Sequence, residues 1–182
     1  MKFITEWDLL VLEAVGDMRN PVLTFILRIF THLADAGIFW IFVCLMLILY
    51  PRTRRIGIFA AVALAAQVLL GEVLIKHIVC RERPFFYVPS IDTIINHPTS
   101  YSFPSGHTSA SFAVSLSVLF QNRKLGLPLL VAAFLIGFSR MYFMVHYPTD
   151  VICGMLLGTL TAIAVFFILG YLSKKHSIKY LE

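Results

Sequence analysis

Two histidines and an aspartate are the candidates for catalytic residues in this sequence. His146 precedes Asp150 by four residues, so the carboxylate can hold one imidazole nitrogen and leave the other nitrogen free to attack. His107 has no carboxylate at a matching spacing, and we expect it to protonate a leaving oxygen and later to activate water. The pattern predicts nucleophilic catalysis, with His146 as the better candidate for the nucleophile.

The segment 103–107, Phe-Pro-Ser-Gly-His, predicts a helix start that faces an anion. Pro104 suits the first helical position, where a missing N–H costs nothing, and Gly106 lets the backbone approach a ligand closely. The free N–H groups of such a first turn attract phosphate, and the hydroxyl of Ser105 can add a hydrogen bond. Taken alone, the same residues also fit an ordinary loop-to-helix junction with His107 on the surface.

Three basic side chains, Lys76, Arg83 and Arg140, offer the positive charge that a phosphoryl group needs. The two guanidinium groups match phosphate oxygens with a planar fork, and Lys76 adds a point charge. Each of the three taken singly also fits an anchor at a membrane surface. Glu72, one helical turn before Lys76, is interpreted as the partner in a structural ion pair rather than as a catalytic carboxylate. No group of Asp, Glu, Cys and His residues has metal-like spacing, so neither a metal nor another cofactor is expected.

The composition indicates that membrane helices position these residues. Of the 182 residues, 59% are hydrophobic and only 14% are charged, which is outside the range of soluble globular proteins. The net charge is +5, and we expect a lipid bilayer and a membrane lipid phosphate, not nucleic acid, as partners. The fold class that follows is an all-α, polytopic membrane helix bundle, which forms a single domain over residues 1–182.

The apolar runs predict about six transmembrane helices, preceded by an interfacial helix at residues 2–15. The spans are expected at 21–33, 38–50, 56–75, 108–120, 125–138 and 151–172. The first two are shorter than about 20 residues and need tilt or local thinning of the bilayer to cross it, so their limits stay open. The polar connection between the third and fourth spans carries aromatic side chains, and whether residues 85–101 form a lid is left open.

Lys and Arg are concentrated on one side of this layout. With a cytoplasmic N-terminus, that side collects the turns 51–55 and 122–124 and the C-terminal tail, whereas the opposite side holds few basic residues. The positive-inside rule then places His107, with the other reactive and basic residues, on the outer face. We expect a multi-pass protein of a bacterial-type plasma membrane with its active site on the extracytoplasmic side.

Three stretches resemble the signature motifs of the type 2 phosphatidic acid phosphatase superfamily, a family of integral membrane lipid phosphatases. They are Lys76 through Arg83-Pro84, Pro104-Ser105-Gly106-His107, and Ser139-Arg140 with His146 and Asp150. The resemblance implies a phosphohistidine intermediate on His146, oriented by Asp150, with His107 as acid and base. It also implies that no metal is required and that the phosphate is held by Lys76, Arg83, Ser105, Gly106, His107 and Arg140.

The resemblance leaves the lipid open. By analogy within the family, we favour hydrolysis of undecaprenyl diphosphate to undecaprenyl phosphate, a step of cell wall lipid recycling. The alternatives are a phosphatidylglycerophosphate, phosphatidate or lipid A phosphatase and, outside enzymes, a carrier that binds a phospholipid without turnover. The soluble vanadium haloperoxidases share the phosphate pocket, but the spanning helices argue against them. Headgroup, chain length and oligomeric state are not decided by the sequence.

Overall fold

The computed structural model describes the chain apart from residues 1, 88–92 and 180–182, and the described part contains helices and no strands. The elements are α1 (Lys2–Asp17), α2 (Pro21–Leu33), η1 (Asp35–Gly37), α3 (Ile38–Leu49), α4 (Arg54–Gln67), η2 (Val68–Ile75), α5 (Lys76–Val79), α6 (Pro84–Tyr87), α7 (Gly106–Leu119), α8 (Arg123–Tyr142) and α9 (Pro148–Lys179). Of these, η1 is a 3₁₀ turn and η2 is a π-helix. The predicted all-α fold class is confirmed.

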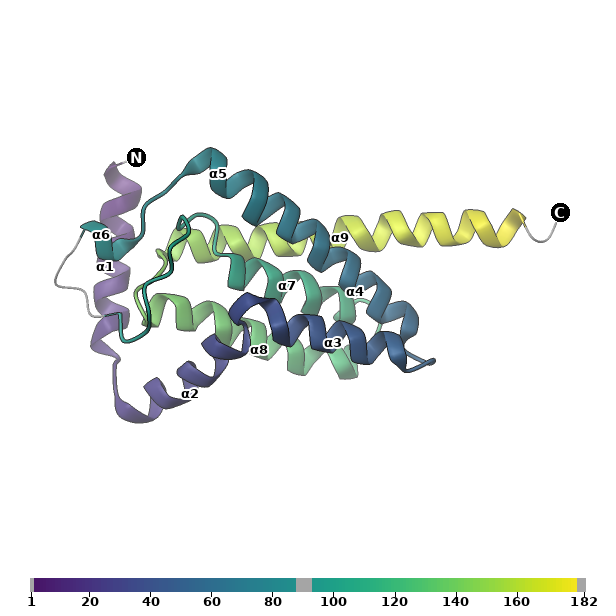
Figure 1. Cartoon of the computed structure of the whole chain (residues 1–182), viewed down its shortest axis with the longest axis horizontal. Coiled ribbons are helices and arrows are strands. Elements are labelled where there is room, and N and C mark those ends of the chain that lie inside the picture. Colours follow the sequence, from purple (N-terminus) through teal and green to yellow (C-terminus); the bar gives the residue numbers. More distant parts are fainter. Residues whose placement is uncertain (1, 88–92, 180–182) are drawn as a thin grey trace.

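The long helices run back and forth between the two ends of the bundle, and α1 lies across one of these ends (Figure 1). The pair α2–α3 leads away from α1, the run α4–η2–α5 returns, and α7, α8 and α9 follow in alternating directions. The end of α5, the start of α7, the end of α8 and the start of α9 therefore all reach the end of the bundle at which α1 lies.

A sharp break separates α2 from α3. Asn20 caps α2 by accepting a hydrogen bond from the N–H of Leu23 at 2.9 Å, and Pro21 stands in the first helical turn. The helix ends before η1, in which Ala36 and Gly37 have positive φ angles of 51° and 70°. Left-handed backbone stops a helix and is easy for glycine. The following helix, α3, is bent by 49° from α2.

Neither α2 nor α3 is long enough to cross a membrane alone, where the sequence predicted separate spans at 21–33 and 38–50. Within the described residues, three helices are long and apolar enough to cross a membrane, and the bent pair would be a fourth. Helix α7 has 14 residues, or about 21 Å, which is shorter than a hydrocarbon core of about 30 Å. The predicted count of six spans is therefore not confirmed.

Helix α7 forms the centre of the bundle and packs against α4, α8 and α9. Its buried residues include apolar side chains and also four serines, which are small and let neighbouring helices approach closely: Ser109, Ser111, Ser115 and Ser117. The contact with α9 is so close that a Cβ atom added at Gly158 would lie 2.3 Å from the carbonyl oxygen of Ser109. From the other side, Trp40 of α3 donates a hydrogen bond to the hydroxyl of Ser111 at 2.9 Å.

Helix α1 is joined to the same end of the bundle as the start of α7. The backbone N–H of Thr149 donates to Asp8 at 2.9 Å, and Arg19 donates to the carbonyl oxygen of Tyr142 at 3.1 Å. The transverse position agrees with the interfacial helix predicted at residues 2–15. The expected placement of the N-terminus on the side opposite His107 is wrong, however, because α1 contacts the start of α9 next to the predicted site residues.

Candidate active site

A cavity of about 540 Å³ opens at the end of the bundle that α1 crosses. Its walls come from the α2–α3 break, η2, residues 95–100 and the neighbouring ends of α7 and α8. The predicted site residues that line it are Lys76, Arg83, Gly106, His107, Arg140 and His146. The remaining two, Ser105 and Asp150, are fully buried next to this wall. The structure thus brings all the predicted site residues together.

His146 lies in the short connection between α8 and α9, with 1% of its surface exposed. Its Nε2 atom is 3.1 Å from Nη1 of Arg83, and its Nδ1 atom is 3.5 Å from Oδ2 of Asp150. Because a guanidinium group can only donate, Nε2 must accept, and the ring proton belongs on Nδ1, toward the carboxylate. The nitrogen with the available electron pair is therefore Nε2, on the side of Arg83.

The surroundings of His146 also keep its ring neutral. The connection that carries it lies outside the spanning helices, and the pKa of His146 is well below its usual range. Burial is the main cause, since a buried imidazolium loses its hydration, and the positive charges of Arg83, Arg140 and Lys76 lower the pKa further. A neutral ring retains the electron pair that a nucleophile needs.

Asp150 is fully buried in the first turn of α9, and both of its carboxylate oxygens are engaged. Oδ2 accepts from the hydroxyl of Ser102 at 2.5 Å and from the backbone N–H of Tyr147 at 3.0 Å, and the second contact caps the helix. Oδ1 accepts from Arg81 at 2.7 Å. These contacts fix the carboxylate, and through it the orientation of the His146 ring.

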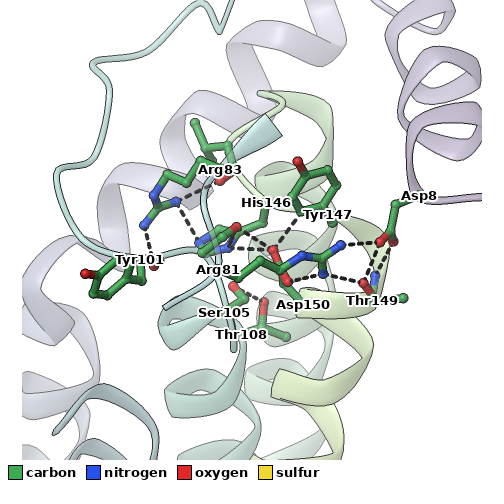
Figure 2. Close-up of polar contacts among 12 residues, drawn as sticks. Asp8, Arg81, Arg83, Tyr101, Ser105, Thr108, His146, Tyr147, Thr149 and Asp150 are labelled. Atoms are coloured by element: carbon green, nitrogen blue, oxygen red, sulfur yellow. Dashed lines mark hydrogen bonds and ion pairs between the residues drawn. The ribbon is translucent and has the colours of Figure 1, made fainter. Parts of the chain in front are cut away.

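Arg81 and Asp8 support Asp150 from behind, and neither was singled out from the sequence (Figure 2). Arg81 donates to Asp150 at 2.7 Å and to Asp8 at 2.5 Å, while its guanidinium carbon lies 4.0 Å from the centre of the Tyr147 ring. Asp8 also accepts from the N–H and the hydroxyl of Thr149. In the sequence, Asp8 is one of several acidic residues on α1, and nothing distinguishes it from the others as a partner of Arg81.

Arg83 lines the cavity and is held there by backbone acceptors. Its Nε atom donates to the carbonyl oxygen of Ser100 and its Nη1 atom to that of Val145, both at 2.7 Å. Nη2 reaches the carbonyl oxygen of Tyr101 at 3.3 Å. Because the guanidinium is fixed in this way, its fork stays beside His146 without needing a bound ligand to order it.

Lys76 and Glu72 form the ion pair that their spacing predicts, with both carboxylate oxygens 2.8 Å from Nζ. The pair lies against the start of α7, where a Cβ atom added at Gly106 would be 1.7 Å from Oε1 of Glu72. Glycine is therefore needed at this position for close approach. A carboxylate thus stands beside the helix start at which the sequence predicted a bound anion.

Arg140, near the end of α8, is 3% exposed and donates from Nη1 to the hydroxyl of Thr31. Its Nε atom is buried and has no hydrogen-bond partner in the part of the chain that the structure describes. A buried donor without an acceptor is costly, and Arg140 lines the cavity. An anion bound in the cavity would supply the missing acceptor.

His107 opens α7, and its ring reaches the α2–α3 break. Its Nε2 atom is 3.1 Å from Oδ1 of Asp35, whose Oδ2 atom is 2.9 Å from Nδ1 of His32. The sequence offered no carboxylate at a matching spacing, and the fold supplies one from 72 positions away. Asp35 was therefore missed, and its only signal was an acidic residue between two apolar stretches.

Ser105 joins the start of α7 to its neighbours. Its hydroxyl accepts from Thr108 at 2.9 Å, and its backbone N–H donates to the carbonyl oxygen of Asp150 at 3.1 Å. It does not line the cavity, so its predicted contact with phosphate stays a prediction.

The connection between α6 and α7 forms one side of the cavity through residues 95–98 and Ser100. Phe85 stacks on His97 with 4.2 Å between ring centres, which ties the start of the connection to its middle. Residues 88–92 of the possible lid at 85–101 lie outside the described part. The role of this connection as a lid stays open.

The side chains of the cavity suit an anion better than a cation. Its wall holds three basic residues, Lys76, Arg83 and Arg140, against the carboxylates of Asp35 and Glu72. Across the described ranges, no group of three or more His, Cys, Asp and Glu residues is placed to hold a metal ion. These positive charges favour a bound phosphate group, and Nε of Arg140, which lacks a partner among the described residues, could contact it directly.

Known proteins have sequences similar to this chain. The family model of the PAP2 superfamily matches residues 56–174. The chain is 32% identical over 163 residues to the bacitracin transport permease protein BcrC of Bacillus licheniformis, which covers 88% of this chain and 77% of that one. It is 34% identical over 154 residues to the undecaprenyl-diphosphatase BcrC of Bacillus subtilis, which covers 85% of this chain and 75% of that one.

A solved structure shares the fold. The PAP2 type phosphatidylglycerolphosphate phosphatase of Bacillus subtilis superposes with a TM-score of 0.76 at 26% identity, over 96% of this chain and 88% of that one. The predicted family and the predicted multi-pass membrane architecture are thereby confirmed. The family match covers well over half of the chain and includes every predicted site residue. This chain is a membrane lipid phosphatase that belongs to the PAP2 superfamily.

Proposed function

We propose that the chain removes the terminal phosphate of undecaprenyl diphosphate and leaves undecaprenyl phosphate, through a phosphohistidine on His146. The observation that carries this proposal is the geometry of that ring. Nδ1 faces the buried carboxylate of Asp150, Nε2 is an acceptor, and three basic side chains line the cavity beside it. The choice of lipid is supported by the relative from B. subtilis that is named an undecaprenyl-diphosphatase.

In the first half-reaction, Nε2 of His146 attacks the terminal phosphorus atom. The bond between this phosphorus and the bridging oxygen breaks, and the three basic residues of the cavity neutralise the charge on the other phosphate oxygens. His107 gives a proton to the bridging oxygen, so undecaprenyl phosphate leaves. Asp150 stabilises the positive charge that develops on the attacking imidazole.

In the second half-reaction, water attacks the phosphohistidine. His107, which is now neutral, takes a proton from the water, and the bond between phosphorus and Nε2 breaks. Inorganic phosphate is released and His146 recovers its electron pair. The sequence of steps consumes one water molecule and needs no other reactant.

We also assign the cavity to the extracytoplasmic face. The basic residues at the opposite end of the bundle lie in its two turns and at the end of α9, and they include Arg52, Arg54, Arg55, Arg123, Lys124, Lys174 and Lys175. Basic residues also lie at the site end, but their side chains are engaged within the protein: Arg19, Lys76, Arg81, Arg83 and Arg140. The positive-inside rule supports an outward-facing cavity.

A phosphate-release assay on the detergent-solubilised protein tests the proposed function. The substrates are undecaprenyl diphosphate, phosphatidylglycerophosphate, phosphatidate and a phosphorylated lipid A, each with and without EDTA. We expect the fastest release from undecaprenyl diphosphate, no effect of EDTA, and no release by His146→Gln. Faster phosphate release from another lipid would identify that lipid as the substrate. Binding of a lipid without phosphate release would show that the protein is a carrier.

A further inference from the structure

Asp35 lies on the α2–α3 break, outside the three stretches that carry the predicted site. We propose that Asp35 is the positioning residue of His107, and that it holds the acid–base histidine as Asp150 holds the nucleophilic one. This inference rests on the proposed function and deepens it, because it concerns a further residue of the same site.

The carboxylate of Asp35 contacts two imidazole rings. Its Oδ1 atom is 3.1 Å from Nε2 of His107, and its Oδ2 atom is 2.9 Å from Nδ1 of His32. An ionised carboxylate only accepts, so the contact places a proton on Nε2 of His107. Nδ1 of His107 is then the nitrogen that gives and takes the proton of the reaction. The contact thus selects one tautomer and one ring orientation.

The backbone of the break directs the carboxylate into the cavity. Ala36 and Gly37 follow Asp35 with positive φ angles of 51° and 70°, and all three residues line the cavity together with His107. A left-handed alanine is unfavourable and persists where the surrounding structure requires it. The break therefore holds the carboxylate of Asp35 at the cavity, in a position that a continuous helix would not give it.

The negative charge of Asp35 has a specific use at His107. To act as an acid, His107 must carry a second proton, which the positive charge of Arg140 across the same cavity opposes. The carboxylate of Asp35 is in direct contact with the ring and offsets this repulsion. Without it, a smaller fraction of His107 would carry the proton that the leaving oxygen needs, and the ring would be free to rotate.

The two carboxylates of the site therefore affect different steps. Asp150 acts on the attacking ring, so its loss slows attack on every substrate. Asp35 acts on proton transfer to the leaving group and from water, so its loss should spare the attack on a substrate whose leaving group needs no proton. A substrate such as 2,4-dinitrophenyl phosphate meets this condition and separates the two roles.

The test compares Asp35→Asn with the unmodified protein, and Asp17→Asn on the exposed end of α1 is the matched control. With undecaprenyl diphosphate, we expect Asp35→Asn to lower turnover by about 10²-fold or more. With 2,4-dinitrophenyl phosphate, acid-labile phosphate on the protein should form at a rate within about threefold of the unmodified protein and then persist, because its hydrolysis needs His107. Asp17→Asn should change neither rate.

A double variant shows whether Asp35 acts through His107. If it does, Asp35→Asn combined with His107→Gln turns over no more slowly than His107→Gln alone. Additive losses would overturn the proposal, and so would an Asp35→Asn protein that forms no phosphohistidine from 2,4-dinitrophenyl phosphate. If the unmodified protein releases no phosphate and traps none from either substrate, the proposed function itself fails, which is a different result.

Discussion

At the scale of single residues, the site consists of reactive side chains that are each held by a fixed partner. His146 is oriented by Asp150, and Asp150 is fixed in turn by Arg81 and the start of α9. Such a chain of contacts holds the attacking nitrogen in place before a substrate arrives, which is how preorganised sites lower a barrier. Each link of the chain leads to a measurable expectation.

The first expectation concerns pH. The pKa of His146 lies well below its usual value of 6.5, so the ring stays neutral while the pH falls through that value. We expect the rate of phosphohistidine formation from 2,4-dinitrophenyl phosphate to stay level through pH 6.5 and to decline only at clearly lower pH, once substrate ionisation is corrected for. Rapid-quench measurements across pH check this. A midpoint at or above 6.5 would contradict it.

The second expectation concerns Arg81, which bridges Asp8 and Asp150 with a guanidinium fork. In Arg81→Lys, a single ammonium group cannot hold both carboxylates in the same geometry. Since Arg81 does not line the cavity, we expect kcat to fall by about 10- to 100-fold with KM nearly unchanged. Steady-state kinetics measure both constants, with Arg123→Lys at the exposed start of α8 as control. A raised KM with an unchanged kcat would show that Arg81 contacts the substrate.

At the scale of elements, the predictable part of the site is the part that lies at helix ends. Lys76, His107 and Arg140 stand where helices begin or end at one face of the bundle, so helical periodicity and charge were sufficient to bring them together. Asp35 was not predictable as a partner of His107, because their contact joins positions 72 residues apart and leaves no local pattern. The contact between Asp8 and Arg81 joins positions 73 residues apart.

The bend at η1 could not be predicted from the sequence either. Two short apolar stretches around an acidic residue and a glycine are equally compatible with a reversal and with a bend. Hydropathy measures burial and not direction, so it cannot distinguish a bend of 49° from two antiparallel spans. The side of α1 depends on this choice, and it was mispredicted for that reason.

The packing of α7 against α9 gives a third expectation. In Gly158→Ala, the new Cβ atom would lie 2.3 Å from the carbonyl oxygen of Ser109, so the two helices must move apart. We expect a loss of stability of about 1–3 kcal/mol. Gly170→Ala on the same helix meets nothing within 4 Å and should be neutral or stabilising by up to about 1 kcal/mol. Thermal unfolding in one detergent compares them, and equal midpoints would argue against the close α7–α9 contact.

At the scale of the whole molecule, α1 lies at the end of the bundle that holds the cavity, and the two turns that carry Arg52 to Arg55 and Arg123 to Lys124 lie at the other end (Figure 1). The helix α9 begins at the end of the bundle where α1 lies and ends at the far end. The N-terminal helix and the end of α9 therefore lie at opposite ends of the bundle. This arrangement can be tested without any knowledge of the substrate.

The fourth expectation is a labelling pattern on intact cells. Cys80 is exposed at the cavity end, so an impermeant maleimide should label it from outside, and Cys80→Ser should abolish this signal. In the Cys80→Ser background, Asp17→Cys should also label from outside, whereas Lys124→Cys should label only after the membrane is opened. Labelling of Lys124→Cys on intact cells would invert the orientation. Labelling of Asp17→Cys and Cys80 on different sides would refute the shared end.

The length of α9 determines where a fusion partner can be placed. With 32 residues, the helix is about 48 Å long, whereas the hydrocarbon core of a bilayer is about 30 Å thick. Its final turns therefore act as a spacer that carries whatever follows beyond the lipid headgroups. An affinity tag or fluorescent protein attached after this spacer would stay clear of the end of the bundle that holds the cavity, whereas one attached before α1 would lie at that end.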